Sequence, residues 1–151
     1  MTNKIPNGVW KQIVEHSPLV SVDLIIEHDG GILLGRRENE PVRGQWFTPG
    51  GVVRKGESLN EAIDRVACGE IGCQVTVHAK LGVYEHFYDC SEFENVSKHY
   101  IPIAYVVEPE KEMPVTDSQH SSFEVFAPPY SGFHEYVQTY LDDYTSWKSH
   151  Q

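Results

Sequence analysis

The sequence contains little cysteine and little positive charge, and each shortage argues against a class of protein. There are three cysteines in 151 residues, Cys68, Cys73 and Cys90, and no two of them form a CxxC pair. An odd, scattered set of this kind argues against a disulfide framework and against a cysteine-based zinc site. Twelve basic residues stand against 22 acidic ones, which gives a net charge of −10. Because nucleic acids and membrane surfaces are polyanions, we expect neither as a partner.

The sequence also lacks long apolar runs. No segment approaches the roughly 18 apolar residues of a membrane-spanning helix. Residues 1–16 lack the apolar centre and the small-residue cleavage site of a signal peptide. With thiols that we expect to be reduced, these absences predict a cytoplasmic protein. The length and the ordinary composition, 40% hydrophobic and 23% charged, predict a single domain over residues 1–151.

Apolar segments separated by turn residues predict both strands and helices. We expect strands at 18–27, 32–37, 73–88, 99–107 and 123–126, with 73–88 forming two strands or one bent strand. We expect helices at 8–15, at 58–71 and after the Pro128-Pro129 pair. Strands before and after a central helix, with a further helix at the end, predict a mixed α/β sandwich.

The two longer helices each show a continuous apolar face. In the segment 58–71, Ser58 is a suitable N-cap, and Glu61 three positions later completes a capping-box pattern. The apolar residues of this segment recur at spacings of three and four: Leu59, Ala62, Ile63, Val66 and Ala67. The C-terminal helix has a similar face, which we expect to be core rather than a ligand site: Phe133, Tyr136, Val137, Tyr140, Leu141 and Tyr144.

The stretch GVVRKGESLNEAIDRVACGEIGC, residues 51–73, joins a glycine-containing loop to the central helix. Glycine lets the backbone approach a ligand closely. Glu70, near the end of the helix, could share a hard cation such as Mg²⁺ with substrate phosphates and with a backbone carbonyl of the Gly50-Gly51 loop. A single helical glutamate is more often a solvated surface charge, so this stretch alone leaves both interpretations open.

The pattern G-x5-E-x7-R-x4-E-x-G in this stretch resembles the Nudix box, the 23-residue signature of the Nudix hydrolases. The family has further glutamates at the two positions that Val66 and Gly69 hold here. Positions 66, 69 and 70 share one face of a helix, so a complete box gathers three carboxylates. This chain offers only Glu70. The resemblance implies an α/β/α Nudix sandwich with a mixed sheet.

One Nudix branch, the GDP-mannose mannosyl hydrolases, lacks the same glutamates. The chain is similar to it over residues from about 17 to 126, through SPLVSVDLII, LLGRRENEPVRGQWFTPGG, YEHFYD, SKHY and DSQH. The resemblance implies one Mg²⁺ ion, or Mn²⁺ in its place, held by the carbonyl of Gly50 and the side chains of Glu70 and Gln119. It also implies that His120 is the general base. A Gln-His pair by itself is equally typical of a polar loop tip.

The same resemblance implies roles for four further residues. Arg37 contacts the diphosphate and Tyr100 stabilises it as it departs, so both join the catalytic set. Asp23 and His86 complete the substrate-binding set. Asp23 lies in the apolar segment SVDLII, where an unpaired carboxylate is costly to bury. The plainer interpretations stay open for the other three: a surface arginine, an ordinary strand tyrosine and a structural histidine.

One position departs from the pattern of the branch, which has an arginine directly after the Gly-Gly pair. This chain has Val52 there. Arg54 would point to the same side if the segment is extended, and it is our candidate replacement for binding substrate. We expect Glu57 and Arg65 to pair with each other at the junction of loop and helix rather than to contact substrate.

Together the residues and the resemblance imply a homodimeric hydrolase. We expect it to cleave GDP-mannose or a related GDP-hexose into GDP and free sugar by attack at C1 of the sugar with inversion. Two alternatives stay open. One is a Nudix pyrophosphatase that cleaves the P–O–P link of a nucleoside diphosphate derivative. The other is a non-catalytic protein that binds a nucleotide sugar and has a decayed box.

Overall fold

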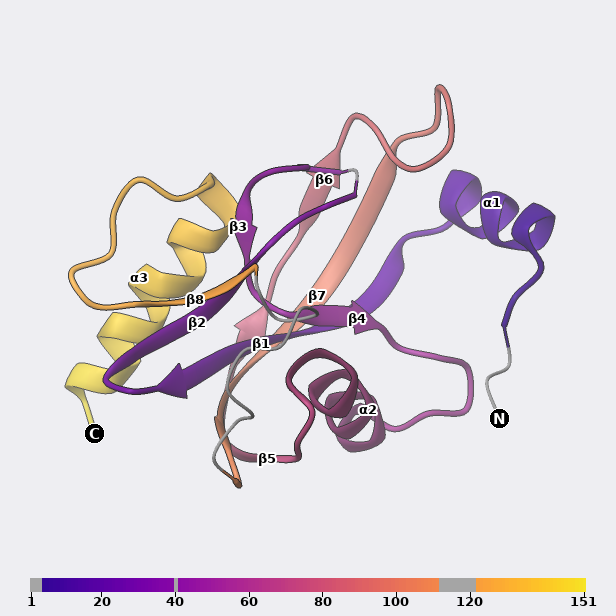
Figure 1. Cartoon of the computed structure of the whole chain (residues 1–151). Helices are drawn as coiled ribbons and strands as arrows, with labels where there is room; N and C mark the ends of the chain where they lie inside the picture. Colours follow the sequence, from indigo (N-terminus) through magenta and orange to yellow (C-terminus); the bar gives the residue numbers. More distant parts are fainter. Residues whose placement is uncertain (1–3, 40, 112–121) are drawn as a thin grey trace.

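The computed structural model describes residues 4–39, 41–111 and 122–151 (Figure 1). In chain order its elements are α1 (Asn7–His16), β1 (Leu19–His28), β2 (Gly31–Arg36), β3 (Trp46–Phe47), β4 (Gly50–Val52), α2 (Leu59–Ile71), β5 (Val75–Val83), β6 (His86–Tyr88), β7 (Lys98–Pro109), β8 (Phe123–Phe126) and α3 (Glu135–Ser149). No helix within these ranges is both long and apolar enough to cross a membrane. The three cysteines are free, as expected.

The strands form one mixed sheet whose main path is β3-β2-β1-β7-β5. At its centre β1 and β7 run parallel, from the pair Leu19–Tyr100 to the pair Ile26–Val107. The other pairs are antiparallel, with β4 against β1, β6 against β7 and β8 against β2. A two-residue turn joins β1 to β2, in which both residues have positive φ angles, 48° at Asp29 and 78° at Gly30.

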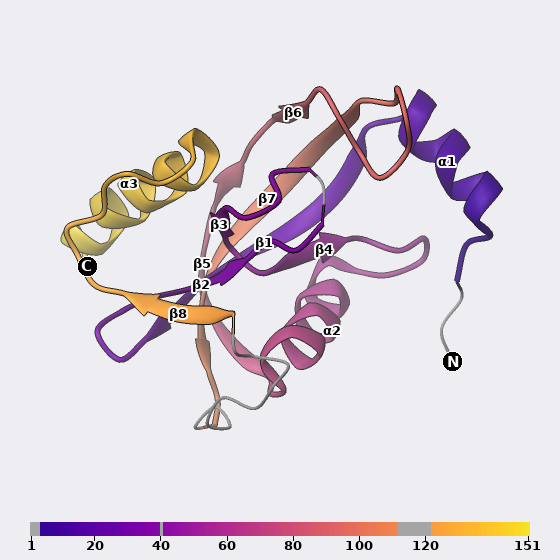
Figure 2. The same cartoon turned by 45° about the horizontal axis from the view of Figure 1, so that its top comes forward.

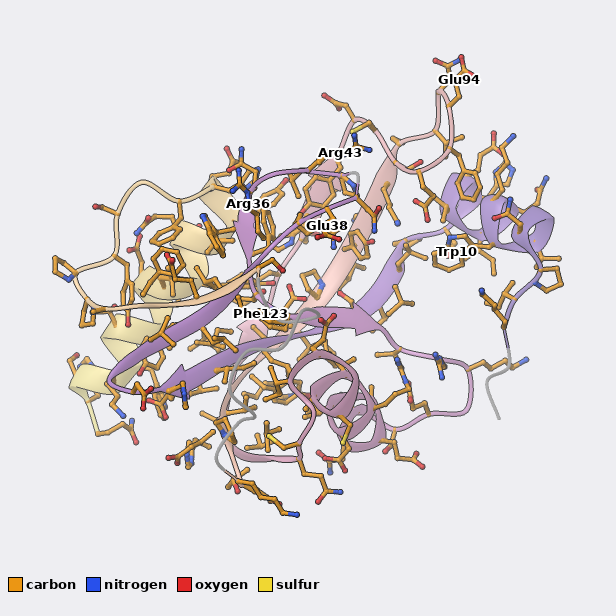
Figure 3. The ribbon with its side chains drawn as sticks, in the orientation of Figure 1. Trp10, Arg36, Glu38, Arg43, Glu94 and Phe123 are labelled. Atoms are coloured by element: carbon orange, nitrogen blue, oxygen red, sulfur yellow. The ribbon has the colours of Figure 1, made fainter. Side chains whose placement is uncertain are left out.

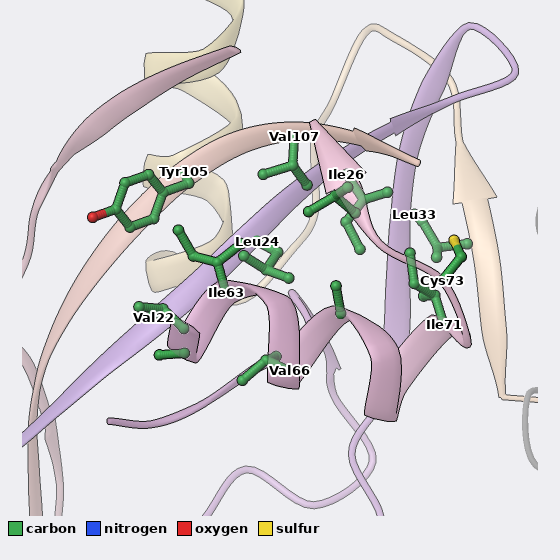
Figure 4. Packing of buried hydrophobic residues seen from close by; sticks show 13 residues of the cluster. Val22, Leu24, Ile26, Leu33, Ile63, Val66, Ile71, Cys73, Tyr105 and Val107 are labelled. Carbon is green, nitrogen blue, oxygen red and sulfur yellow. The ribbon is translucent and has the colours of Figure 1, made fainter. Parts of the chain in front are cut away.

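The helices α2 and α3 cover opposite faces of this sheet, and α1 lies apart from both (Figures 1 and 2). Side chains alternate between the two faces along β1, as they must in a strand. Val22, Leu24 and Ile26 pack against Ile63 and its neighbours on α2 (Figure 4). Ile25 belongs to the second core, with the buried face of α3. That face consists of Val137, Tyr140, Leu141 and Tyr144. The predicted α/β/α sandwich is therefore confirmed.

The long elements and the short strand β8 match the sequence-based expectations closely, whereas the short strands β3 and β4 do not. Ser58 caps α2: its Oγ accepts from the backbone N of Glu61 at 3.1 Å, and Glu61 Oε1 accepts from the backbone N of Ser58 at 2.8 Å. The segment 73–88 forms two strands. The strands β3 and β4 were not expected, because two and three residues are too few to show an alternating pattern. Pairing with β2 and β1 defines them instead.

The ion pair between Glu57 and Arg65 fastens the loop after β4 to α2, as predicted. Arg65 Nε donates to Glu57 Oε2 at 2.7 Å and Arg65 Nη2 donates to Glu57 Oε1 at 3.0 Å. Arg65 Nη2 also donates to the carbonyl of Val52, the last residue of β4, at 2.9 Å. The hydrogen bonds from Arg65 lower the pKa of Glu57 to about 2. The carboxylate is therefore stabilised in its ionised form.

We predict that Glu57→Gln lowers the free energy of unfolding at pH 7 by about 2 kcal/mol, because Arg65 loses its charged partner. Since the pKa of Glu57 is depressed on folding, the wild type should lose this stabilisation as the pH falls from 4.5 toward 2. Urea unfolding at pH 7 and pH 3 measures both effects. The matched control is Glu94→Gln, at an exposed glutamate in the loop between β6 and β7 (Figure 3). Equal stability of the two variants at pH 7 would contradict this role of the pair.

Candidate active site

Two adjoining cavities open beside β4. The larger has a volume of about 520 Å³ and the smaller about 100 Å³. They share four lining residues, Arg37, Phe47, Thr48 and Gly50. The two cavities are therefore parts of one cleft, and a ligand longer than either cavity would pass these four residues.

The larger cavity lies between the end of α2 and the loop after β2. Gly69 and Glu70 line it from the last turn of α2, Arg36 lines it from the end of β2, and residues 37–39 line it from the loop. Phe123, at the start of β8, lies between that loop and α2 (Figure 3). The carboxylate of Glu70 lies on one wall, and the other wall carries Arg36 and Arg37 together with Glu38. This arrangement suits a cation at Glu70 and an anionic group between the cation and the arginines.

Arg37 is the described arginine that reaches both cavities. Its Nε donates to the carbonyl of Pro41 at 3.3 Å, which ties the guanidinium to its own loop. This contact uses one of its five N–H donors, so the rest of the fork can bind an anion. The placement favours the predicted diphosphate contact over an ordinary surface charge.

A partly buried carboxylate, that of Asp23, lines the smaller cavity. Asp23 Oδ2 accepts a hydrogen bond from the hydroxyl of Tyr140 on α3 at 2.6 Å. Burial raises the pKa of Asp23 to about 6, against the opposing effects of the Tyr140 hydrogen bond and of the Arg37 charge. Asp23 is paired in the strand register with Gly50, and a Cβ at Gly50 would collide with Asp23 Oδ1. Glycine at position 50 therefore leaves room for this carboxylate.

His86 lines the smaller cavity from β6 as a neutral side chain. Its ring stacks on that of Tyr136, with centroids 4.0 Å apart and 4° between the planes. Burial, together with the charge of His134, lowers the pKa of His86 to about 4. At neutral pH the imidazole is therefore uncharged and forms part of an aromatic wall that also includes Tyr88 and Tyr100.

The cleft brings most of the predicted site residues together. The larger cavity is lined by Arg37, Gly50 and Glu70, and the smaller by Asp23, Arg37, Gly50, His86 and Tyr100. The predicted ligand Gln119 and the predicted base His120 lie outside the described residues. Sequence reasoning missed Tyr88 and Thr48, which also line the cleft. Tyr88 could have been predicted from the sequence, because it is two positions from His86 and side chains two apart in a strand point to the same face.

Arg54 lies outside the described lining of the cleft. An extended segment was the condition for Arg54 to replace the arginine missing at Val52. The strand β4 ends at Val52, and a turn follows in which the backbone N of Glu57 donates to the carbonyl of Arg54 at 3.0 Å. Arg54 is exposed and is not among the described residues that line either cavity. Its predicted substrate-binding role gains no support from this placement.

Comparison with known proteins identifies the family and the fold. The NUDIX domain family model matches residues 17–144. The chain belongs to the Nudix family. It is 53% identical over 142 residues to the low-salt glycan biosynthesis protein Agl8 of Haloferax volcanii, covering 93% of this chain and 91% of that protein. It is 38% identical over 91 residues to the ADP-ribose pyrophosphatase of Methanocaldococcus jannaschii, covering 60% of this chain and 51% of that protein.

Solved Nudix structures share the fold at low identity. A MutT Nudix hydrolase from Burkholderia pseudomallei aligns with a TM-score of 0.64 and 24% identity, covering 85% of this chain and 98% of that one. A UDP-X diphosphatase aligns with a TM-score of 0.64 and 18% identity, covering 98% of this chain and 74% of that one.

Nudix hydrolases generally use a divalent metal ion such as Mg²⁺. Within the described ranges, no group of three or more His, Cys, Asp or Glu residues is arranged to hold one.

The two Nudix-box positions without glutamate have different surroundings. Val66 is 4% exposed and belongs to the core between α2 and the sheet (Figure 4). Its Cγ2 lies so close to Gly51 that a Cβ there would be 2.9 Å away. Gly69 lines the larger cavity, and a Cβ there would have no heavy atom within 4 Å. Val66 thus has a packing role, whereas Gly69 leaves open space beside Glu70.

We predict that a glutamate is tolerated at position 69 and not at position 66. Gly69→Glu should leave the free energy of unfolding unchanged or raise it by up to about 1 kcal/mol, because it replaces a helical glycine next to open space. Val66→Glu should lower it by about 3 kcal/mol or more, because it buries a carboxylate in an apolar core. Urea unfolding in metal-free buffer measures both. Equal stability of the two variants would mean that Val66 is not packed as described.

We predict that Asp23→Asn stabilises the metal-free protein at pH 7.5 by about 1–3 kcal/mol, because wild-type folding must desolvate a carboxylate. The amide oxygen can still accept from Tyr140. Since the pKa of Asp23 is raised on folding from 3.8 to about 6, wild-type stability should fall as the pH rises through this window. At pH 4.5 Asp23→Asn should raise the free energy of unfolding only slightly. Asp64→Asn, at an exposed position on α2, is the control. A gain that is equal at both pH values would contradict the desolvation.

Proposed function

We propose that this protein hydrolyses GDP-mannose or a related GDP-hexose, with Mg²⁺, to GDP and the free sugar. Water attacks C1 of the sugar, and the configuration there inverts. The observation that carries the proposal is the division of the cleft. A small polar cavity joins a larger one that has arginine and carboxylate walls, and Arg37 and Gly50 line both. A nucleotide sugar has the same order of parts, with a diphosphate between the sugar and the nucleoside.

The smaller cavity has the chemistry of a sugar subsite. Its volume of about 100 Å³ is too small for a nucleoside. Its walls offer a carboxylate at Asp23, hydroxyl groups at Tyr88 and Tyr100, and the aromatic face of His86. Sugar hydroxyls bind to such acceptors and donors, and the apolar faces of the ring pack on aromatic side chains. The diphosphate then lies at the junction, within reach of Arg37.

The donors that would hold the metal ion are oxygen atoms, which fit Mg²⁺ or Mn²⁺. Gly50 and Glu70 both line the larger cavity, and we propose that Gln119 completes the set. A Mg²⁺ ion held by these residues would supply positive charge that stabilises the departing diphosphate. Glu70 is the one charged side chain in this donor set. Because a single negative charge offsets little of the charge of several divalent ions, we propose that one ion is bound.

The reaction needs a proton acceptor and a stabilised leaving group from this chain. As the water oxygen bonds to C1, the bond from C1 to the β-phosphate oxygen breaks, and the electron pair leaves on GDP. We propose that His120 accepts the proton of the attacking water, because the ordinary pKa of histidine lies near neutral pH. Arg37 and Tyr100 donate hydrogen bonds to the departing diphosphate, and Asp23 orients the sugar.

The name of the Haloferax volcanii relative supports a nucleotide-sugar substrate. That protein is described as a glycan biosynthesis protein, and the chain is 53% identical to it over most of both lengths. Glycan biosynthesis uses nucleotide sugars as glycosyl donors, so an enzyme that acts on one has a place in it.

We also propose a homodimer in a cytoplasmic setting, which light scattering and cell fractionation would test.

A second candidate function is cleavage of the P–O–P link. The relative from Methanocaldococcus jannaschii is described as an ADP-ribose pyrophosphatase, and the larger cavity could hold its type of substrate. Attack at phosphorus relies on metal-activated water. The helix α2, which carries the Nudix box, brings one carboxylate, Glu70, to the cavity. Because several metal ions would need more ligands than this, we favour attack at the sugar carbon.

We predict that hydrolysis of GDP-mannose in ¹⁸O-labelled water puts the label on the sugar and none on GDP. The first-formed mannose should be the β anomer. Mass spectrometry of the products and early-time NMR measure the two outcomes. His120→Gln should lower the rate on the order of 10²–10⁴-fold, because it removes the general base. His16→Gln, at an exposed histidine on α1, should have no effect.

Other products would contradict the proposal in distinct ways. Labelled GMP or labelled mannose 1-phosphate would identify the pyrophosphatase. Tight Mg²⁺-dependent binding of GDP-mannose without turnover would identify a non-catalytic binding protein. Turnover of a different nucleotide sugar at C1 would keep the mechanism and change the substrate.

A further inference from the structure

Lys98, the first residue of β7, is a buried charged residue to which the proposed reaction gives no role. It is 6% exposed, and it is the one buried lysine, arginine, aspartate or glutamate in the described part of the chain. It is not among the described residues that line either cavity of the cleft. Burying a charge costs free energy unless partners compensate for the lost hydration. The surroundings of this ammonium group therefore indicate what it does.

The ammonium group of Lys98 has one carboxylate and two aromatic rings around it. Its Nζ donates to Glu92 Oε1 at 2.8 Å, and Trp10 Nε1, on α1, donates to Glu92 Oε2 at 2.9 Å (Figure 3). Nζ lies 5.7 Å from the centroid of the Trp10 ring and 5.3 Å from that of the Tyr100 ring. Both distances are within the range of a cation–π interaction. Lys98 therefore joins α1 and the loop after β6 to a tyrosine of the cleft.

Tyr100 contacts Lys98 and also lines the smaller cavity. The two residues are two positions apart in β7, so their side chains point to the same face of the sheet. A second ring, that of Tyr88, packs edge-on against Tyr100 with centroids 6.0 Å apart. The Tyr100 hydroxyl forms no hydrogen bond with another described residue, and it is not among their buried polar atoms that lack a partner. It is therefore accessible to a ligand.

Anchoring of α1 does not by itself require a charge at position 98. The helix already packs against the sheet through a hydrophobic cluster that includes Val14, Leu19 and Val96. Apolar residues that replace a buried ion pair often leave a protein equally stable or more stable. An apolar side chain would not reproduce the contact between the charge and the Tyr100 ring. This contact therefore points to a role of the charge in the cleft.

We propose that Lys98 is a positioning residue that acts through Tyr100. The assignment rests on the proposed function, in which Tyr100 donates a hydrogen bond to the departing diphosphate. The ammonium group holds the ring of Tyr100 at the wall of the smaller cavity. It also draws electron density from the ring, which makes the hydroxyl a stronger donor. Because the diphosphate gains negative charge as its bond to C1 breaks, the effect is largest in the transition state and should appear in kcat more than in KM.

The test measures kcat and KM for hydrolysis of GDP-mannose in the presence of Mg²⁺. Lys98→Met keeps an unbranched side chain and removes the charge, so it should lower kcat about tenfold and leave KM within about twofold of the wild type. Lys98→Arg keeps a cation that can pair with Glu92 and lie over the ring, so its kcat should be within about threefold of the wild type. The matched control is Lys148→Met, on α3, which should leave both constants unchanged. Lys148 also donates to a carboxylate, that of Glu27 at 2.8 Å, and its Nζ lies 5.9 Å from the centroid of the Trp147 ring.

A double-mutant cycle tests whether the effect passes through the Tyr100 hydroxyl. Tyr100→Phe should lower kcat by itself. In that background Lys98→Met should change kcat by less than about twofold, because the hydroxyl on which the charge acts is gone. A tenfold loss of kcat from Lys98→Met in both backgrounds would overturn the inference.

A variant without either charge separates loss of positioning from loss of folding. Lys98→Met leaves the Glu92 carboxylate without its partner, whereas Lys98→Met combined with Glu92→Gln leaves neither charge unpaired. The combined variant should melt within about 5 °C of the wild type and show the same tenfold loss of kcat. Glu92→Gln alone keeps the ammonium group over Tyr100 and should retain kcat within about threefold. Wild-type kcat in the folded combined variant would contradict the proposed role.

The kinetic results separate the inference from the proposed function. If the wild type hydrolyses GDP-mannose at C1 and Lys98→Met has the wild-type kcat, the inference is wrong while the proposed function stands. A higher KM with unchanged kcat in Lys98→Met would place the charge in ground-state binding and again overturn the inference. If the wild type does not hydrolyse GDP-mannose, the proposed function fails, and the inference fails with it.

Discussion

The antiparallel pairing of β4 with β1 is the constraint on which the site depends. It sets Gly50 beside Asp23 and brings the backbone of Gly51 against Val66 on α2. A Cβ at either glycine would collide, with the Asp23 carboxylate in one case and with the Val66 side chain in the other. Close approach of this short strand therefore joins the central sheet to the box helix, and the cleft forms where the strand begins.

The sequence was informative where a signal extends over many residues. The apolar strands, the capping box at Ser58 and the helix spacing predicted the layers, and a spaced motif predicted the family. The short strands β3 and β4 were missed because tertiary pairing, not local pattern, forms them. The hydrogen bond between Asp23 and Tyr140 joins residues 117 positions apart, and spacing along a sequence gives no sign of it.

The helix α2, which carries the Nudix box, contributes both to the hydrophobic core and to the lining of the cleft. Val66 packs in the core, and Gly69 leaves space in the cavity, so Glu70 is the carboxylate that the box helix brings there. The opposite wall carries Arg36 and Arg37 together with Glu38. In the proposed reaction Glu70 is the carboxylate that holds the metal ion, and water attacks a sugar carbon rather than phosphorus. In the proposed reaction Asp23 binds the sugar, although its burial disfavours the ionised form.

The central claim is that this cleft works with one divalent ion. The most direct measurement is the number of Mn²⁺ ions bound per chain in the presence of GDP, followed by electron paramagnetic resonance during a titration. The account predicts one ion per chain, with binding lost in Glu70→Gln. Two or three tightly bound ions per chain would contradict it, because further carboxylates would then have to reach the cleft from outside the box helix.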